Sequence, residues 1–332
     1  MAAHLLARWL DQMVLPAISA PMFLVSGPRL VIESCKAGII GSFPVLNART
    51  SDQLEEWLQA ITNELAAIKQ AEPERCVAPW AVNLIVHHSN KRFDDDLALI
   101  TAYQPPLVIT SLGDPMRVVE VVHAYGGLVF SDVSTVHHAR KAAQKGVDGL
   151  ILVCNGAGGH AGVINPLAFM GEVKQFWQGI TVLAGCVSHG HDILAAEVLG
   201  ADLAYMGTRF IATEESMASD SYREMLRQAT LEDLLYTDAF SGVKANYLVP
   251  SIRGAGLDPD ALQKKAEMDF TFVKADGTGA KAWKDIWSAG QGVGAVKNVQ
   301  SVASVVSELR CEYEAAYRTL SEKQIKRNAP FH

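Results

Sequence analysis

The chain has 332 residues, of which 49% are hydrophobic and 20% are charged, and its formal net charge is −7 at pH 7. A chain of this length can bury a large core, and it suits one α/β domain or one barrel with a smaller attached part. The acidic balance, with no dense cluster of Lys or Arg, excludes a nucleic-acid-binding surface, so we expect no nucleic-acid partner.

The cysteines and the amino terminus indicate the compartment. Five widely spaced cysteines without a CxxC pair are typical of reduced thiols. The first nine residues include His4 and Arg8 and lack the apolar core of a signal peptide. No apolar run approaches the roughly 20 residues that a membrane span needs. We therefore expect a cytoplasmic protein that has no membrane partner.

Taken in chain order, eight short apolar or β-branched runs alternate with segments of helical spacing. Most runs are continuously apolar, which is typical of strands covered on both faces in a parallel sheet. The predicted strands are Leu15–Met22, Ala37–Pro44, Val77–Val86, Leu107–Leu112, Leu128–Val133, Gly149–Cys154, Thr181–Cys186 and Leu203–Thr208. The predicted helices include Gln53–Gln70, Pro115–Tyr125, Thr135–Lys145 and His191–Leu199, and Gly126, Gly146 and Gly200 are expected to cap the last three.

This alternation predicts an α/β fold, and specifically a (β/α)8 TIM barrel. A doubly wound open sheet is the alternative, because a strand count from one sequence is easily wrong by one or two. We assign residues 1–211 and 286–332 to the barrel, with a long helical pattern at Val296–Arg318 closing it.

The alternation stops after the eighth predicted strand. Residues 212–285 contain helix-like segments at Ser219–Ala229 and Asp258–Met268, with Pro and Gly between them. We expect this block to be an inserted, mainly helical smaller subdomain that covers the substrate pocket.

A glycine-rich loop with one histidine at its centre follows the sixth predicted strand. The loop reads Gly156-Ala157-Gly158-Gly159-His160-Ala161-Gly162. Its glycines allow the backbone to approach a ligand closely, and His160 is its single titratable group. We therefore predict that His160 is a catalytic base. The alternative is a tight turn with a surface histidine.

Two polar residues lie at the ends of apolar strands. An amide such as Asn83 in a buried strand needs a partner or a ligand, because an unsatisfied buried amide is costly. Asp132 ends the fifth predicted strand, where active sites of barrels form. A satisfied core amide and a helix N-cap are the structural alternatives for these two residues.

The last two predicted strands end in glycine-containing turns, Ala184-Gly185-Cys186 and Met206-Gly207-Thr208-Arg209. Adjacent strand ends that present backbone N–H groups can bind a phosphate, and barrels commonly bind one after strands seven and eight. These turns therefore predict a phosphate-bearing cofactor. The sequence has no P-loop lysine motif and no GxGxxG run, which disfavours ATP and a dinucleotide in a Rossmann site.

Two further groups of residues are weaker candidates. The spacing His189-x-His191 is that of a metal-binding pair, but the sequence shows no carboxylate or third histidine at a convincing distance, so we predict no metal site. Cys154 and Cys186 lie at strand ends, but neither has an activating partner evident in the sequence, and buried core thiols are the commoner explanation.

The sequence resembles the flavin-dependent nitronate monooxygenase family, formerly called 2-nitropropane dioxygenases, over nearly its whole length. The most specific similarities are Gly158-Gly159-His160-Ala161-Gly162 and Gly207-Thr208-Arg209-Phe210, which have the family's order and spacing. Further matching runs are Ala20-Pro21-Met22, Gly38-Ile39-Ile40-Gly41, Val82-Asn83-Leu84, Ala184-Gly185 and Trp287-Ser288-Ala289-Gly290-Gln291-Gly292-Val293-Gly294.

The resemblance implies a non-covalent FMN whose phosphate lies at the loops after strands seven and eight, with His160 as the base and Met22 behind the isoalloxazine ring. The cofactor-binding residues that we predict are Ala20, Met22, Asn83, Asp132, Gly158, Gly159, Gly185, Met206, Gly207, Thr208, Gln291 and Gly292. One departure concerns the Gln-Gly-x-Glu run that typically precedes the glycine-histidine loop, which here reads Val153-Cys154-Asn155-Gly156.

We therefore predict an FMN-dependent nitronate monooxygenase that oxidises alkyl nitronates or nitroalkanes with O2. The alternative is a flavin reductase that uses NAD(P)H as a co-substrate and acts on quinones or an enoyl thioester. A third reading is a non-enzymatic barrel that binds a flavin or phosphate ligand. Tyr236, Phe240 and Tyr247 are candidate aromatic walls of the substrate pocket, and the sequence leaves a homodimer open.

Overall fold

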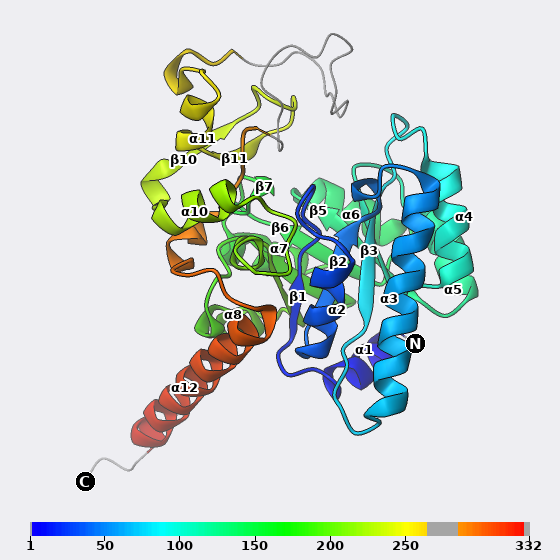
Figure 1. Ribbon diagram of the computed structural model, residues 1–332. Helices are drawn as coiled ribbons and strands as arrows, with labels where there is room; N and C mark the ends of the chain where they lie inside the picture. Colours follow the sequence, from blue (N-terminus) through cyan, green and yellow to red (C-terminus); the bar gives the residue numbers. More distant parts are fainter. Residues whose placement is uncertain (1, 264–284, 329–332) are drawn as a thin grey trace.

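Eight parallel strands close into a barrel at the centre of the protein (Figure 1). The structure is a computed structural model that describes residues 2–263 and 285–328. β1 pairs with both β2 and β9, which closes the sheet and excludes the open-sheet alternative. The TIM-barrel prediction is confirmed. The barrel strands are β1 (Ala17–Ser19), β2 (Ile40–Pro44), β3 (Trp80–Ile85), β4 (Leu107–Ser111), β5 (Leu128–Val133), β6 (Gly149–Val153), β8 (Ile180–Ala184) and β9 (Leu203–Met206).

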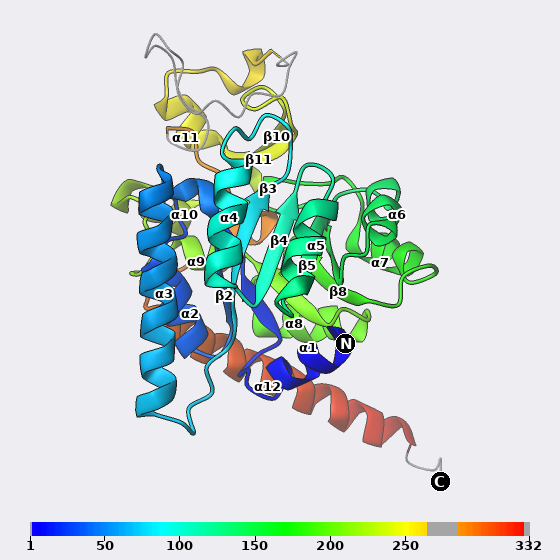
Figure 2. The same ribbon diagram turned by 90° about the vertical axis from the view of Figure 1, so that its right-hand side faces the viewer.

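Helices surround the barrel (Figure 2). Thr50 and Thr135 start two of them by accepting hydrogen bonds from the backbone N–H groups of Gln53 and His138. All five helices predicted before residue 230 are present, with ends within about two residues of the prediction. The helices are α1 (Ala2–Leu10), α2 (Pro28–Lys36), α3 (Ser51–Ala71), α4 (Phe93–Tyr103), α5 (Met116–Ala124), α6 (Val136–Gln144), α7 (Pro166–Val173), α8 (Gly190–Val198), α9 (Thr208–Ile211), α10 (Asp220–Gln228), α11 (Val249–Gly254) and α12 (Val302–Asn328).

Two later predictions need correction. The helix predicted at Asp258–Met268 is wrong for the part that the structure describes, where Asp258 accepts a hydrogen bond from the N–H of Asp260 and starts only a 3-10 turn, Pro259–Ala261. Residues 264–268 lie outside the described residues. α12 begins at Val302 rather than Val296, because Gln300 instead forms a β-bridge with Thr213.

The barrel interior is layered by the alternation of side chains along its strands. Ile109 and Phe130 point into an apolar lower layer, which α1 closes from below with Leu6 and Trp9. Figure 2 shows α1 at that end of the barrel. Two residues further along β4 and β5, the same alternation turns Ser111 and Asp132 inward. The barrel therefore has an apolar base and a polar upper layer at the carboxyl ends of its strands.

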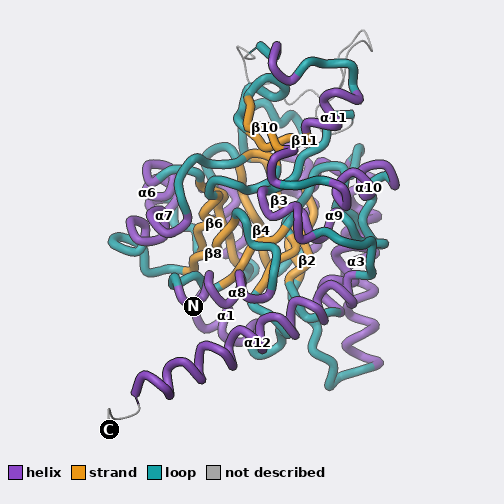
Figure 3. Tube along the Cα trace, turned by 90° about the vertical axis from the view of Figure 1, so that its left-hand side faces the viewer, coloured by secondary structure: helices purple, strands orange, loops and turns teal. Residues whose placement is uncertain are grey.

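The block after β9 lies above those carboxyl ends, as the tube in Figure 3 shows. Besides α10 and α11, it supplies β10 (Leu234–Thr237) and β11 (Ala245–Leu248), two strands that the sequence analysis did not predict. They form an antiparallel sheet in the order β10-β11-β7, in which β7 (Gly159–His160) belongs to the glycine-rich loop. The domain boundaries at 211/212 and 285/286 stay a prediction.

The last helix, α12, packs against α8 and α2, and its carboxyl end extends beyond the barrel (Figures 1 and 3). The contact with α8 is between backbones: a Cβ built on Gly190 would lie 1.9 Å from the carbonyl oxygen of Leu309 and 2.4 Å from the nitrogen of Tyr313. None of the described helices is both long enough and apolar enough to span a membrane.

We expect Gly190→Ala to displace α12 and to lower the free energy of unfolding by about 3 kcal/mol, because backbone atoms cannot move aside as side chains can. Gly171→Ala is the matched control, since its Cβ would meet no atom within 4 Å. Thermal unfolding followed by circular dichroism measures both. Equal midpoints for the two variants would contradict the tight contact.

Candidate active site

A cavity of about 430 Å³ lies at the carboxyl ends of the barrel strands, within the size range of cofactor and ligand sites. Strand ends, the glycine-rich loop and the inserted block all contribute to its walls. The predicted site residues that line it are Ala20, Met22, Asn83, Asp132, Gly158, Gly159, His160, Gly185, Gly207, Thr208 and Gly292. The structure thus brings together residues that are up to 272 positions apart (292 − 20).

Two predicted cofactor residues, Met206 and Gln291, do not line the cavity. Met206 is fully buried in an apolar cluster, and its carbonyl oxygen accepts a hydrogen bond of 2.9 Å from the N–H of Ala20. Gln291 donates its N–H to the carbonyl oxygen of Gly156 at 2.8 Å. Neither side chain lines the cavity. Their roles in the structure are to fix the loops that do.

His160 lies on β7, opposite Ala245 of β11, and lines the cavity. Its Nε2 is 3.3 Å from the hydroxyl oxygen of Ser241, which also donates a hydrogen bond to the carbonyl oxygen of Val243. Burial lowers the pKa of His160 from 6.5 to about 4. The imidazole is therefore neutral at pH 7 and can accept a proton at one nitrogen.

The glycines of the His160 loop pack against the backbone of another chain segment, around Gly290. A Cβ on Gly158 would lie 2.8 Å from the nitrogen of Gly290, and one on Gly290 would lie 2.9 Å from the carbonyl oxygen of Gly156. Asn246 of β11 donates its side-chain amide to the carbonyl oxygen of Ala157 at 2.7 Å. These glycines were predicted to allow close approach of a ligand, but Gly156 and Gly158 instead form a backbone contact with Gly290 that holds His160 in place.

A chain of hydrogen bonds runs through the polar upper layer of the barrel. The Asn83 amide donates to the hydroxyl oxygen of Ser111 at 2.7 Å, and the Ser111 hydroxyl donates to Oδ2 of Asp132 at 2.6 Å. Burial raises the pKa of Asp132 to about 6, against the lowering effect of Ser111. The Oδ1 atom of Asp132 and the hydroxyl of Tyr205 are buried without a hydrogen-bond partner among the described residues.

The structure agrees with the satisfied-amide alternative for Asn83 and excludes the helix-cap alternative for Asp132. Asn83 is a satisfied amide, since it also donates to the carbonyl oxygen of Ile109, yet it lines the cavity. Asp132 does not cap a helix, because Thr135 caps α6. An unpartnered acceptor and a buried phenol beside a cavity would gain hydrogen bonds from a polar ring bound there.

The strand ends predicted to hold a phosphate line one part of this cavity. Gly185 has a φ of 115°, and Cys186 has a φ of 61°, an unusual conformation for a residue with a side chain. Thr208 lines the cavity, but its hydroxyl accepts a hydrogen bond of 2.8 Å from the N–H of Gly290. Its side chain fixes the same turn that packs on the His160 loop.

Several residues that support the site were not predicted from the sequence, and Asn47 is one of them. Asn47 is buried, accepts a hydrogen bond from the N–H of Leu24, and donates to the carbonyl oxygens of Met22 and Ser26. It thereby fixes the loop after β1 that carries Met22. Nothing local in the sequence distinguishes this asparagine, because its partners lie 21 to 25 positions earlier.

The candidate aromatic walls have different positions. Phe240 lines the cavity. Tyr247 is fully buried and packs edge-on against Phe240 with 4.9 Å between ring centroids, so it supports the wall from behind. Tyr236 donates its hydroxyl to the carbonyl oxygen of Ala161 at 2.8 Å and fixes the end of the His160 loop.

The sequence profile of the nitronate monooxygenase family matches residues 9–312. The chain belongs to the nitronate monooxygenase family. It is similar to a nitronate monooxygenase from Neurospora crassa, with 27% identity over 89% of this chain and 88% of that protein. It is also similar to a hydroxy-methyl-oxo-octahydroindene-carboxyl-CoA dehydrogenase from Mycobacterium tuberculosis, with 26% identity over 82% of this chain and 78% of that protein.

The fold is shared with a nitroalkane oxidase from Streptomyces ansochromogenes, at a TM-score of 0.75 and 24% identity, over 93% of this chain and 99% of that one. This member of the nitronate monooxygenase family is therefore an oxidoreductase built on a TIM barrel. The altered lead-in at Val153-Cys154-Asn155-Gly156 lies on and directly after β6, and Val153 and Gly156 line the cavity.

We expect Asp132→Asn to stabilise the apoprotein at neutral pH and to leave it unchanged at pH 4. Because the folded-state pKa of about 6 exceeds the ordinary value of 3.8, the unfolded chain loses this proton first as the pH rises. The wild type therefore loses up to about 3 kcal/mol between pH 4 and pH 6 relative to the variant, a difference that persists above pH 6.

Thermal unfolding at pH 4 and pH 7.5 measures this difference. The exposed Asp11, changed to Asn, is the control. A gain for Asp132→Asn that is the same at both pH values would contradict the raised pKa.

Proposed function

We propose that the protein is an FMN-dependent oxidoreductase that oxidises alkyl nitronates with O2, with His160 acting at the carbon beside the nitro group. The observation that supports this most directly is a neutral, half-buried imidazole in the wall of a cofactor-sized cavity. The family membership supports the same class of reaction.

The residues of the cavity fit FMN. The turns at Gly185-Cys186 and Gly207-Thr208 would hold its phosphate, as strand ends seven and eight do in other barrels. Asn83 and Asp132 would lie at polar edges of the ring, where the unpartnered Oδ1 of Asp132 gains a partner. When bound, FMN accepts electrons from the substrate and passes them to O2, and the protein supplies position and electrostatics.

The role of His160 differs between two forms of the substrate. Toward a neutral nitroalkane, the unprotonated ring nitrogen takes the proton from the carbon beside the nitro group. Toward a nitronate, which has already lost that proton, His160 has no proton to take, because its one N–H is directed to the Ser241 oxygen and the other ring nitrogen is unprotonated. Burial makes the imidazole a weaker base, so it takes a proton from a neutral nitroalkane less readily than an exposed histidine would. An alkyl nitronate needs no such proton transfer and is therefore the better substrate.

Ser241 positions the ring. Its hydroxyl oxygen is 3.3 Å from Nε2 of His160 and is anchored by Val243, so it selects which nitrogen faces the cavity. Ser241 comes from the inserted block, and it lines the cavity together with Phe240 and Val243 of the same block. The substrate specificity of the enzyme therefore depends on this block as well as on the barrel.

His160→Asn should spare flavin binding and reduce kcat/KM for a neutral nitroalkane by about 100-fold or more, the usual contribution of a general base. The loss for the corresponding nitronate should be much smaller. Steady-state oxygen consumption with both substrates measures this, and flavin absorbance of the purified variant checks cofactor content. His138→Asn, the same change at an exposed histidine outside the cavity, is the matched control and should leave both activities unchanged. Equal losses on the two substrates would remove the base role.

A second function has specific support. The similarity to a CoA dehydrogenase and the altered lead-in at residues 153–156 favour an acyl thioester as the alternative substrate, with NAD(P)H as the reductant of the flavin. His160 would then donate a proton or anchor the thioester.

Anaerobic mixing separates the two functions. We expect an alkyl nitronate to bleach the flavin absorbance and NADH and NADPH to leave it unchanged, because the proposed reaction takes its electrons from the nitronate. Rapid bleaching by either nicotinamide, with no response to the nitronate, would favour the thioester or quinone reductase. A purified protein that stays colourless after addition of FMN would contradict both.

A further inference from the structure

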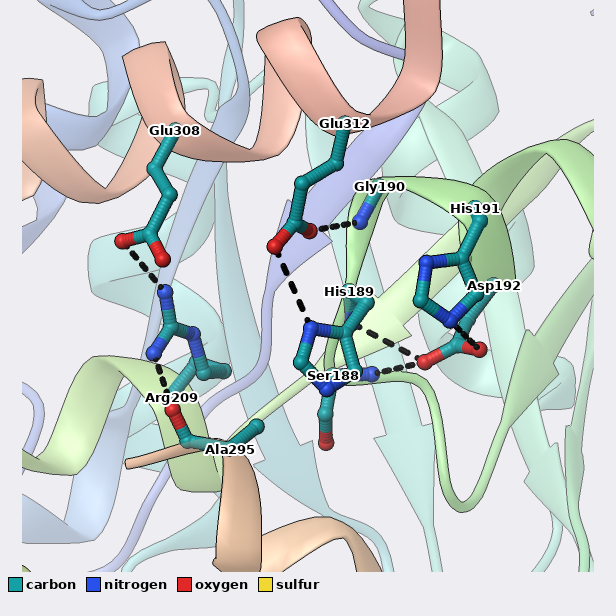
Figure 4. Close-up of polar contacts among 9 residues, drawn as sticks. All are labelled: Ser188, His189, Gly190, His191, Asp192, Arg209, Ala295, Glu308 and Glu312. Atoms are coloured by element: carbon teal, nitrogen blue, oxygen red, sulfur yellow. Dashed lines mark hydrogen bonds and ion pairs between the residues drawn. The ribbon is translucent and has the colours of Figure 1, made fainter. Parts of the chain in front are cut away.

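Three side chains with metal-binding groups converge outside the cavity (Figure 4). His189 and His191 lie at the start of α8, and Glu312 reaches them from α12, which is 121 positions further along the chain than His191 (312 − 191). No metal site was predicted from the sequence, because no carboxylate or third histidine lies at a convincing distance along the chain from the two histidines. The fold supplies that carboxylate.

The spacing of the three groups suits a metal ion. The ligand atoms of all three lie within 4.8 Å of one another, and Nδ1 of His189 is 3.3 Å from Oε1 of Glu312. Two ligands that each lie about 2.0–2.1 Å from a tetrahedral zinc ion are about 3.3–3.4 Å apart. The rings of His189 and His191 are nearly parallel, with an interplanar angle of 11° and 4.9 Å between centroids. Small rotations of these side chains therefore bring the groups around one ion.

Backbone hydrogen bonds hold the ligands from behind. Oε2 of Glu312 accepts a hydrogen bond of 2.6 Å from the N–H of Gly190, which leaves Oε1 to face His189. The carboxylate of Asp192 accepts hydrogen bonds from the N–H groups of Ser188 and His189 at 2.9 Å, and its other oxygen is 3.4 Å from Nε2 of His191. Such partners orient ligands and raise metal affinity.

The neighbouring cation does not compete for Glu312. Arg209 of α9 donates hydrogen bonds to Glu308, which lies one turn before Glu312 on α12, at 2.9 Å and to the carbonyl oxygen of Ala295 at 2.6 Å, as Figure 4 shows. The carboxylates of Glu312 and Asp192 offset the positive charge of an ion and the amino end of α8. The two imidazole rings remain partly open to solvent, with 40% and 57% of their side chains exposed.

We propose that His189, His191 and Glu312 form a site for a divalent transition metal of the zinc class, with water completing its coordination. Two imidazoles and one carboxylate favour Zn2+, Co2+ or Ni2+ over Mg2+ and Ca2+, which prefer oxygen ligands. The ion would tie α12 to the loop after β8, whose first residues Gly185 and Cys186 line the cavity. The role follows from position: the ion stabilises the docking of α12 and takes no part in the oxidation.

Zinc binding to the untagged, chelator-treated protein tests this proposal. Equilibrium dialysis with metal analysis should give one equivalent of Zn2+, and the thermal midpoint of unfolding should rise with added Zn2+. His191→Ala and Glu312→Gln should each weaken binding by at least about tenfold and abolish the thermal shift. The glutamine can still accept the hydrogen bond from Gly190, so this variant should keep α12 in place.

A double variant, His137→Ala with His138→Ala, is the matched control. It removes an exposed histidine pair that has 6.0 Å between ring centroids and keeps all five cysteines, so it should bind Zn2+ as the wild type does. The proposal is overturned if the wild type fails to bind one equivalent of Zn2+. It is equally overturned if the cluster variants bind Zn2+ as tightly as this control.

Discussion

The backbone contact between the glycine-rich loop and the turn at residues 288–292 is the constraint on which the site depends. Gly156, Gly158 and Gly290 approach so closely that none can carry a side chain without moving its neighbour. Through this contact the chain segment that follows the inserted block supports the loop that precedes it. β7 can then pair with β11, and that pairing sets His160 in the cavity wall. The position of His160 therefore depends on the barrel and the inserted block together.

Two titratable groups of the cavity are shifted in opposite directions by the same cause. Burial disfavours charge, so it lowers the pKa of His160 and raises that of Asp132. At neutral pH the histidine carries no charge, while Asp132 titrates near pH 6. At neutral pH the cavity therefore combines a neutral imidazole in one wall with a carboxylate that is mainly ionised, so Asp132 supplies the charge in this part of the site.

The barrel strands could be predicted because each is a local signal: a short apolar run bounded by turn residues. The His160 loop and the glycine-containing strand ends were found for the same reason. The strands β10 and β11 were missed because each is only four residues long and is stabilised by pairing with a distant segment: β10 pairs with β11, and β11 pairs with β7. Asn47 and Glu312 were missed because their partners are distant in the chain, and only the fold shows which polar residues meet.

The order of the elements along the chain has a consequence for biosynthesis. All eight barrel strands are complete by Met206, yet the turn that supports His160 begins at residue 288 and α12, which packs on the outer helices α8 and α2, begins only at Val302. A nascent chain that has been synthesised only as far as β9 therefore contains all the barrel strand ends of the cavity but lacks the turn at residues 288–292 and α12. The cavity gains this support only after residues 288–302 have been synthesised, and until then the apolar side chains that α12 later covers stay open to other contacts.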